Sequence, residues 1–117
     1  MSAGTILLVE DDPWVREACA DLLGGEGYTV IPFDDAARCL DEIPRLLPDL
    51  ILLDLIMPNA QMDGIGLLSS LAGDGACTIP IIILSALGNM LAGTMSSQIT
   101  KALRIVAILP KPVALDT

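Results

Sequence analysis

Short apolar runs alternate along this chain with longer segments in which apolar residues recur at helical spacing. Each run is four or five residues long and is followed by polar or turn-forming residues, which is typical of a strand. The strands predicted in this way are Thr5–Val9, Tyr28–Pro32, Leu50–Leu53, Ile81–Leu84 and Ile105–Leu109.

A first helix is expected directly after the first strand. Asp12 is placed to cap it and Pro13 suits its first position, while Gly24-Gly25 would end it. Its apolar residues recur at helical spacing, and we expect them to face the core. They are Val15, Ala18, Leu22 and Leu23.

Two more helices follow the second and third strands. Asp34 or Asp35 would cap the second, and Pro44 and Pro48 should limit its length. The buried faces are predicted from apolar spacing, with Ala36, Leu40 and Ile43 in the second helix and Ile65, Leu68 and Leu71 in the third. Residues 89–103 have the length of a fourth helix, although Gly93 and several β-branched residues disfavour it.

Strands alternating with helices predict an α/β fold with a doubly wound, five-stranded parallel sheet and right-handed crossovers. The length suits one domain, over residues 1–117. A final helix should follow Pro112 but is truncated or missing, since the chain stops five residues later. We therefore expect a longer native polypeptide, or another element that covers that face of the sheet.

Composition narrows the class of protein. The net charge of −9 disfavours direct contact with nucleic acid. No apolar run is long enough to cross a membrane and no signal peptide is evident, so a cytoplasmic protein is expected. From Gly64 to Thr100 the only charged residue is Asp74, so this stretch either folds inward or meets a partner.

Cysteine and histidine content excludes several kinds of site. Cys19, Cys39 and Cys77 show no metal-binding spacing, and the chain has no histidine. Cys/His zinc sites, histidine-assisted nucleophiles and a phosphohistidine carrier are therefore excluded. The thiols are expected to be buried or half-buried in a reducing compartment.

Polar residues recur at or just after the carboxyl ends of the predicted strands, where open α/β sheets bind ligands. Acidic residues follow the first strand and end the third, a hydroxyl follows the fourth and an ammonium group the fifth; these are Glu10, Asp11, Asp12, Asp54, Ser85 and Lys111. Grouped carboxylates favour a hard divalent cation, Mg²⁺ above all. We expect Asp12 to serve as the helix cap rather than as a ligand.

This set of groups suits phosphoryl transfer. Asp54 would be the nucleophile, Mg²⁺ and Lys111 would neutralise charge on the phosphoryl oxygens, and Ser85 would hydrogen-bond the attached group. A carboxylate nucleophile needs no separate base.

Five short motifs in order resemble the signature of response-regulator receiver domains. They are Leu7–Asp12, Leu52–Pro58, Asp63-Gly64, Leu84–Ala86 and Lys111-Pro112. The resemblance implies strand order 2-1-3-4-5, phosphorylation of Asp54, and a metal held by Glu10, Asp11, Asp54 and the backbone carbonyl of Ile56. It also implies a cytoplasmic two-component regulator that acts with a histidine kinase or phosphotransfer protein, with a homodimer as a candidate assembly.

The chain departs from the family pattern in two places. Four residues, Asn59–Met62, stand between Pro58 and Asp63 where receivers usually have two, so the loop beside the site is longer. Ile108 stands where an aromatic switch residue is common.

The stretch Leu103–Pro112 resembles receivers attached to EAL-type cyclic-di-GMP phosphodiesterases, which makes such an output domain an expectation.

Two alternatives remain open. A haloacid-dehalogenase-like phosphatase also uses a strand-end aspartate and Mg²⁺, but it needs a second aspartate where this chain has Ile56. A pseudo-receiver would act by protein contact without phosphate; the acids, Ser85 and Lys111 argue against it. We expect a regulatory domain that catalyses only its own phosphorylation and dephosphorylation, and not an enzyme with an external substrate.

Overall fold

The structure is a computed structural model, and it describes residues 3–54, 61–62, 64–74, 78–85 and 104–110. Its five strands form one sheet in the order β2-β1-β3-β4-β5, and every neighbouring pair is parallel. Their bounds are β1 Thr5–Val9, β2 Thr29–Phe33, β3 Leu50–Asp54, β4 Ile81–Ser85 and β5 Ile105–Pro110. The predicted fold class and strand order are confirmed.

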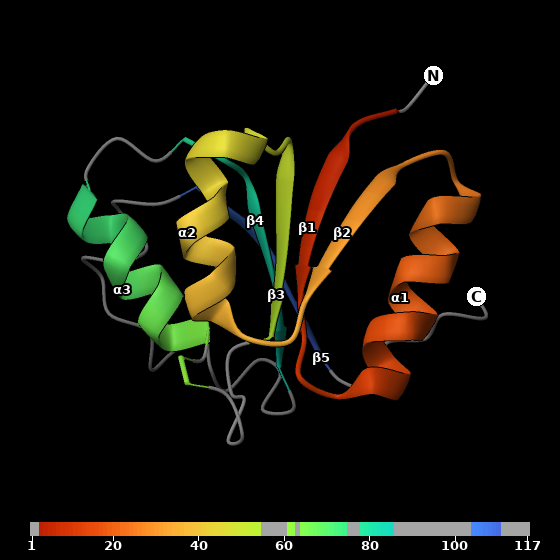
Figure 1. The fold of residues 1–117 in the computed structure, drawn as a ribbon, viewed down its shortest axis with the longest axis horizontal. Coiled ribbons are helices and arrows are strands. Elements are labelled where there is room, and N and C mark those ends of the chain that lie inside the picture. Colours follow the sequence, from red (N-terminus) through yellow and green to blue (C-terminus); the bar gives the residue numbers. More distant parts are fainter. Residues whose placement is uncertain (1–2, 55–60, 63, 75–77, 86–103, 111–117) are drawn as a thin grey trace.

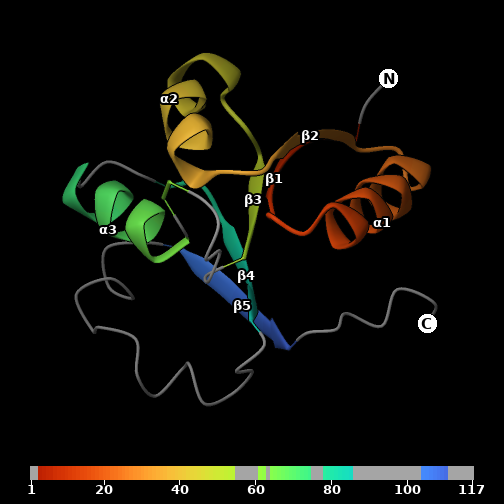
Figure 2. The ribbon, with the colours of Figure 1, turned by 60° about the horizontal axis from the view of Figure 1, so that its bottom comes forward.

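Helices cover both faces of the sheet. Helix α1 (Pro13–Gly25) lies on one face, while α2 (Ala36–Leu46) and α3 (Gly64–Asp74) lie side by side on the other (Figures 1 and 2). The expected helices over residues 89–103 and after Pro112 lie outside the described residues. Among those described, no helix is long and apolar enough to cross a membrane.

Alternation along the strands divides the core into two layers. Leu7, Val9, Ile51 and Leu53 pack with α2 and α3, whereas Ile6, Leu8, Leu52 and Leu84 form the layer with α1. Successive strand residues point to opposite faces, so a run that is apolar at every position suits a sheet with helices on both sides. This arrangement explains the continuous apolar runs of the sequence.

The first helix differs from its prediction in two respects. Cys19, with Val15 and Leu23 one turn on either side, faces the sheet, while Ala18 and Leu22 are exposed. The helix also includes Gly24 and Gly25, and of the three glycines near its end it is Gly27 that has a positive φ, 97°. The N–H groups of Gly27 and Tyr28 bond to the carbonyls of Gly24 and Leu23, the pairing in which a left-handed residue closes a helix.

In the second helix, Asp35 is the cap and Pro44 lies inside the last turn instead of ending the helix. Proline lacks the N–H that would bond to the Leu40 carbonyl and its ring crowds that carbonyl, but Ile43 and Leu46 still pack against the core. In the third helix Leu67, Leu68 and Leu71 are buried, and Ile65, predicted to be buried, is 46% exposed.

Candidate functional site

Three carboxylates converge where β1 and β3 end. The two strands are parallel neighbours with Val9 beside Leu53, so Glu10, the next residue, comes close to Asp54. One carboxylate oxygen from each of Glu10, Asp11 and Asp54 lies within 4.8 Å of the others. Glu10 is fully buried, Asp54 is 4% exposed and Asp11 is half-buried. The structure thus brings together the three acids expected to bind the metal.

The backbone around Glu10 is held on several sides. Its N–H donates to the Phe33 carbonyl at 3.0 Å, which extends the ladder between β1 and β2. Its side-chain Oε1 accepts from the N–H of Asp12 at 3.1 Å. Its own carbonyl accepts from Nη1 of Arg16 at 2.8 Å. These bonds orient the residue at the point where the strand turns into α1.

Asp12 serves as the cap of α1, as predicted. Its Oδ1 accepts from the N–H of Trp14 at 2.9 Å and from that of Val15 at 3.4 Å. The carboxylate therefore satisfies donors that the first turn of a helix leaves free. Because Asp12 is engaged in this way, the acids of this cluster that could hold a metal are Glu10, Asp11 and Asp54.

The donor set fits Mg²⁺. An octahedral ion with oxygen ligands at about 2.1 Å places those oxygens about 3.0 to 4.2 Å apart, so a small closure of the observed cluster suffices. Carboxylates that are buried close together repel each other unless a cation lies between them. Oxygen donors of this kind, and no softer ligands, are what the ion prefers.

Another acidic residue, Asp35, binds the end of the lengthened loop through the N–H groups of Gln61 and Met62. Its carboxylate accepts from the N–H groups of Ala37 at 2.8 Å, Gln61 at 2.6 Å and Met62 at 3.2 Å. The Ala36 N–H donates in turn to the Met62 carbonyl at 3.0 Å. Desolvation raises the pKa of Asp35, but the three N–H groups and Arg38 outweigh it, so the pKa lies below its ordinary value.

The other predicted site residues are placed less fully. Ser85 ends β4 at the same edge of the sheet as Asp54, because Leu84 is paired with Asp54. The side chains of Ser85 and Ile108 lie outside the described part of the molecule, as do Ile56, Leu87 and Lys111. Their assigned roles stay predictions.

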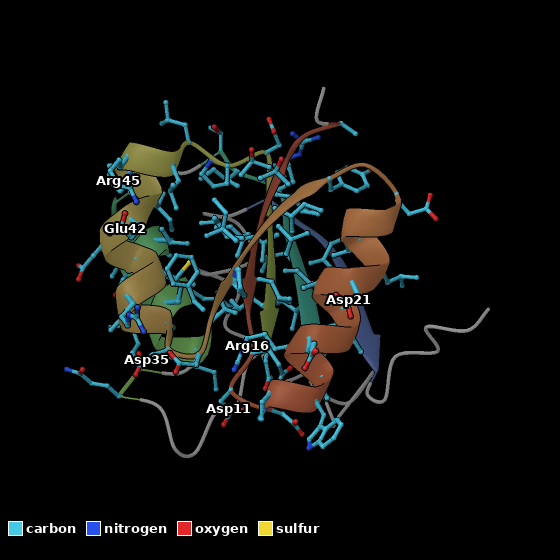
Figure 3. All side chains as sticks on the ribbon, turned by 45° about the vertical axis from the view of Figure 1, so that its right-hand side comes forward. Asp11, Arg16, Asp21, Asp35, Glu42 and Arg45 are labelled. Atoms are coloured by element: carbon cyan, nitrogen blue, oxygen red, sulfur yellow. The ribbon has the colours of Figure 1, made fainter. Side chains whose placement is uncertain are left out.

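Sequence reasoning did not find Arg16. Figure 3 shows it beside Asp11, where α1 begins, and Nη1 contacts the Asp11 carbonyl at 3.4 Å as well as that of Glu10. An arginine near a helix start carries no sequence signal for such a contact, because the direction of its side chain depends on the turn before the helix. The tie between Asp35 and the lengthened loop was likewise unforeseen.

A parallel sheet of this order, with an acidic cluster at its carboxyl edge, defines a receiver-type signalling domain. The family model described as "Response regulator receiver domain" matches residues 6–117. The chain belongs to this family, whose members act in two-component signal transduction.

Two curated relatives illustrate the match. The DNA-binding response regulator MtrA of Mycolicibacterium smegmatis is 38% identical over 69% of this chain, a span that is 34% of the relative. The nitrogen assimilation regulatory protein NtrX of Azorhizobium caulinodans is 33% identical over 75% of this chain and 19% of its own length. The matched spans are therefore only about a third and a fifth of the length of these two relatives. Their names give no support to the expected EAL-type phosphodiesterase output.

Solved structures agree with the fold. The receiver domain of a Francisella response regulator superposes with a TM-score of 0.79 at 26% identity, covering 97% of this chain and 88% of that one. Full-length FixJ from B. japonicum gives 0.78 at 30% identity, covering 99% of this chain and 54% of that one. The beryllium-fluoride-activated receiver domain of Klebsiella pneumoniae RstA gives 0.74 at 29% identity, covering 93% and 86%.

Proposed function

We propose that this domain accepts a phosphoryl group on Asp54 from a histidine kinase or a histidine phosphotransfer protein. The observation that carries the proposal is the convergence of Glu10, Asp11 and Asp54 within 4.8 Å at the carboxyl edge of the sheet. A receiver-family chain that had lost phosphoryl chemistry would have no need to keep this costly cluster of acids half or fully buried.

Each of the three clustered acids has a part in the proposed transfer. A carboxylate oxygen of Asp54 attacks the phosphorus, the new oxygen–phosphorus bond forms, and the bond from phosphorus to the donor nitrogen breaks. The electron pair of that bond leaves with the donor's imidazole. Glu10 and Asp11, with Asp54, would hold Mg²⁺, which when bound neutralises charge on the phosphoryl oxygens. The backbone carbonyl of Ile56 is proposed as a further metal ligand.

Two more residues complete the proposed site. Lys111 would hold a phosphoryl oxygen from the end of β5, and Ser85 would hydrogen-bond the attached group from the end of β4. The position of Ser85 at the same sheet edge as Asp54 supports its role. The support for Lys111 is its place in the family motif, directly after β5.

The kind of output domain that this receiver controls is proposed from the names of its relatives. Because MtrA is named a DNA-binding response regulator, we propose that phosphorylation of this receiver controls a DNA-binding domain. The receiver itself, with its net charge of −9, would not contact DNA. We propose that it acts in the cytoplasm as a regulatory domain whose only chemistry is the formation and hydrolysis of its own acyl phosphate.

The test compares the parent protein with Asp54→Asn. Each is incubated with Mg²⁺ and acetyl phosphate, and its intact mass is measured. We expect one phosphoryl group on the parent and none on the variant. Asp21→Asn, a change on the exposed side of α1, is the matched control and should be labelled like the parent. Equal labelling of Asp54→Asn would reject the assignment, and no labelling of the parent would favour a pseudo-receiver.

A further inference from the structure

We propose that Arg16 is a positioning residue for the metal site, acting through the backbone of Glu10 and Asp11. This inference rests on the proposed function, because it concerns how the ligands of Mg²⁺ are oriented. The observation behind it is that one guanidinium nitrogen, Nη1, donates to two successive carbonyls, at 2.8 Å to Glu10 and at 3.4 Å to Asp11.

The shorter bond, from Arg16 to the Glu10 carbonyl, holds the peptide group that sets the direction of the Asp11 side chain. The Glu10 carbonyl belongs to the peptide group that joins Glu10 to Asp11, so holding it limits rotation on both sides of that plane. The direction of the Asp11 side chain follows from the same rotation. The bond to the Asp11 carbonyl is long and contributes less.

The charge of Arg16 is directed at carbonyls and away from the ligands. Within the described ranges, the ion pairs are Arg38 with Asp34 and Arg45 with Glu42, both at α2, and Arg16 forms none. An arginine that paired with Asp11 or Asp54 would compete with the cation for the carboxylate. Arg16 instead leaves the carboxylates to the metal.

The hydrogen bonds of Arg16, which anchor the backbone here, matter more for Asp11 than for Glu10 or Asp54, because other contacts hold those two residues. The Glu10 side chain is already held by the Asp12 N–H, and its backbone N–H is held by Phe33. Asp54 is held by the sheet itself, as the last residue of β3. Asp11 lies in the turn after the strand and is half-buried, so its orientation depends most on the bond from Arg16.

The charge of Arg16 and its hydrogen bonds predict opposite changes in Mg²⁺ affinity when the residue is replaced. Removing a positive charge beside three carboxylates would, by Coulomb attraction alone, strengthen Mg²⁺ binding. Losing the anchor would weaken it, because residues that orient metal ligands typically contribute about tenfold or more to affinity. A lysine at this position keeps the charge but ends one bond closer to the backbone and lacks the planar fork.

The experiment measures Mg²⁺ binding to the metal-free protein by calorimetry, for the parent, Arg16→Lys and Arg16→Gln. We expect Arg16→Lys to bind about tenfold more weakly than the parent, and Arg16→Gln to bind more weakly by a smaller factor, because its loss of charge offsets part of the loss of the anchor. Arg45→Lys, an exposed change of the same kind on α2, is the control and should bind within about twofold of the parent. Melting temperatures without and with Mg²⁺ are recorded for each.

The outcomes separate a positioning role from a structural one. A lower melting temperature with an unchanged half-saturating Mg²⁺ concentration in both Arg16 variants would overturn the inference, as would tighter binding in Arg16→Gln with parent-like binding in Arg16→Lys. If a variant is destabilised, binding is measured at low temperature, where circular dichroism shows it folded. Absence of Mg²⁺ binding by the parent would instead reject the metal site in the proposed function.

Discussion

Asp35, at the start of α2, accepts a hydrogen bond from the backbone N–H of Gln61, 26 residues further along the chain, with 2.6 Å between oxygen and nitrogen. The same carboxylate caps α2 through Ala37 and binds the N–H of Met62, whose side chain packs against the core. One side chain therefore joins a helix start to the end of the lengthened loop.

Replacing Asp35 should lower stability. Asp35→Ala removes an N-cap and two charge-assisted hydrogen bonds, so we expect the free energy of unfolding to fall by about 2 kcal/mol. Asp34→Ala is the matched control, because Asp34 is paired with an exposed arginine, and it should cost less than about 0.5 kcal/mol. Urea denaturation measures both. Equal losses in the two variants would show that the contacts of Asp35 contribute nothing specific.

The contribution of Asp35 should depend on pH. Its pKa in the folded protein lies below the ordinary value of 3.8, so the unfolded chain takes up the proton first as the pH falls. The stability it adds is complete well above that ordinary value and is lost as the pH falls through the lower, folded pKa. The difference in unfolding free energy between the parent and Asp35→Asn should therefore be constant near neutral pH and shrink in acid. A difference that grows in acid would contradict the lowered pKa.

The thiol of Cys39 should be inert in the folded protein. Cys39 is fully buried, and burial raises its pKa to about 12, so almost no thiolate forms at pH 8. Iodoacetamide labelling followed by digestion and mass spectrometry should show the Cys39 peptide unmodified in buffer and fully modified in urea. Labelling at the same rate in both conditions would mean that Cys39 is accessible in the native state.

Asp11 and Asp12 should differ in their effect on Mg²⁺ binding. Asp11→Asn removes one of the proposed ligand charges, and we expect at least about tenfold weaker binding. Asp12→Asn makes the same change at the adjacent residue but keeps a good helix cap, so it should bind nearly as the parent does. Calorimetry measures both, and the fluorescence of the exposed Trp14, the only tryptophan, gives a second readout. Equal weakening would show a general charge effect.

The acyl phosphate on Asp54 should be long-lived. In receivers, the residues two positions after the phosphoacceptor and after the hydroxyl residue influence the attacking water. Here they are Ile56 and Leu87, whose side chains cannot hydrogen-bond water. We expect Ile56→Asn and Leu87→Glu to speed phosphate loss, and Ile65→Asn, a change at an exposed position of α3, to leave its rate unchanged. If neither polar substitution speeds the loss, water access at these positions does not set the lifetime.

The sequence by itself determined the strands and the acidic cluster. Continuous apolar runs predict strands buried on both faces, and the first was placed at Thr5–Val9 as observed. Once the sheet is parallel, its carboxyl ends share one edge, so the convergence of Glu10, Asp11 and Asp54 follows from their places after β1 and at the end of β3. These features depend on the local pattern of apolar and polar residues and on the parallel sheet that alternating strands and helices form.

Beyond the helix caps, only the tertiary structure decided which partners Arg16 and Asp35 take. Pro44 lies inside α2, which the local pattern did not predict, and Ile43 and Leu46 on either side of it pack against the core. The bonds of Arg16 to the carbonyls before α1, and of Asp35 to Gln61, depend on where separate segments meet in space. A hydrophobic period tells which face of an element is buried, but a carboxylate or guanidinium can bond any donor or acceptor within reach, and that reach exists only after the chain has folded.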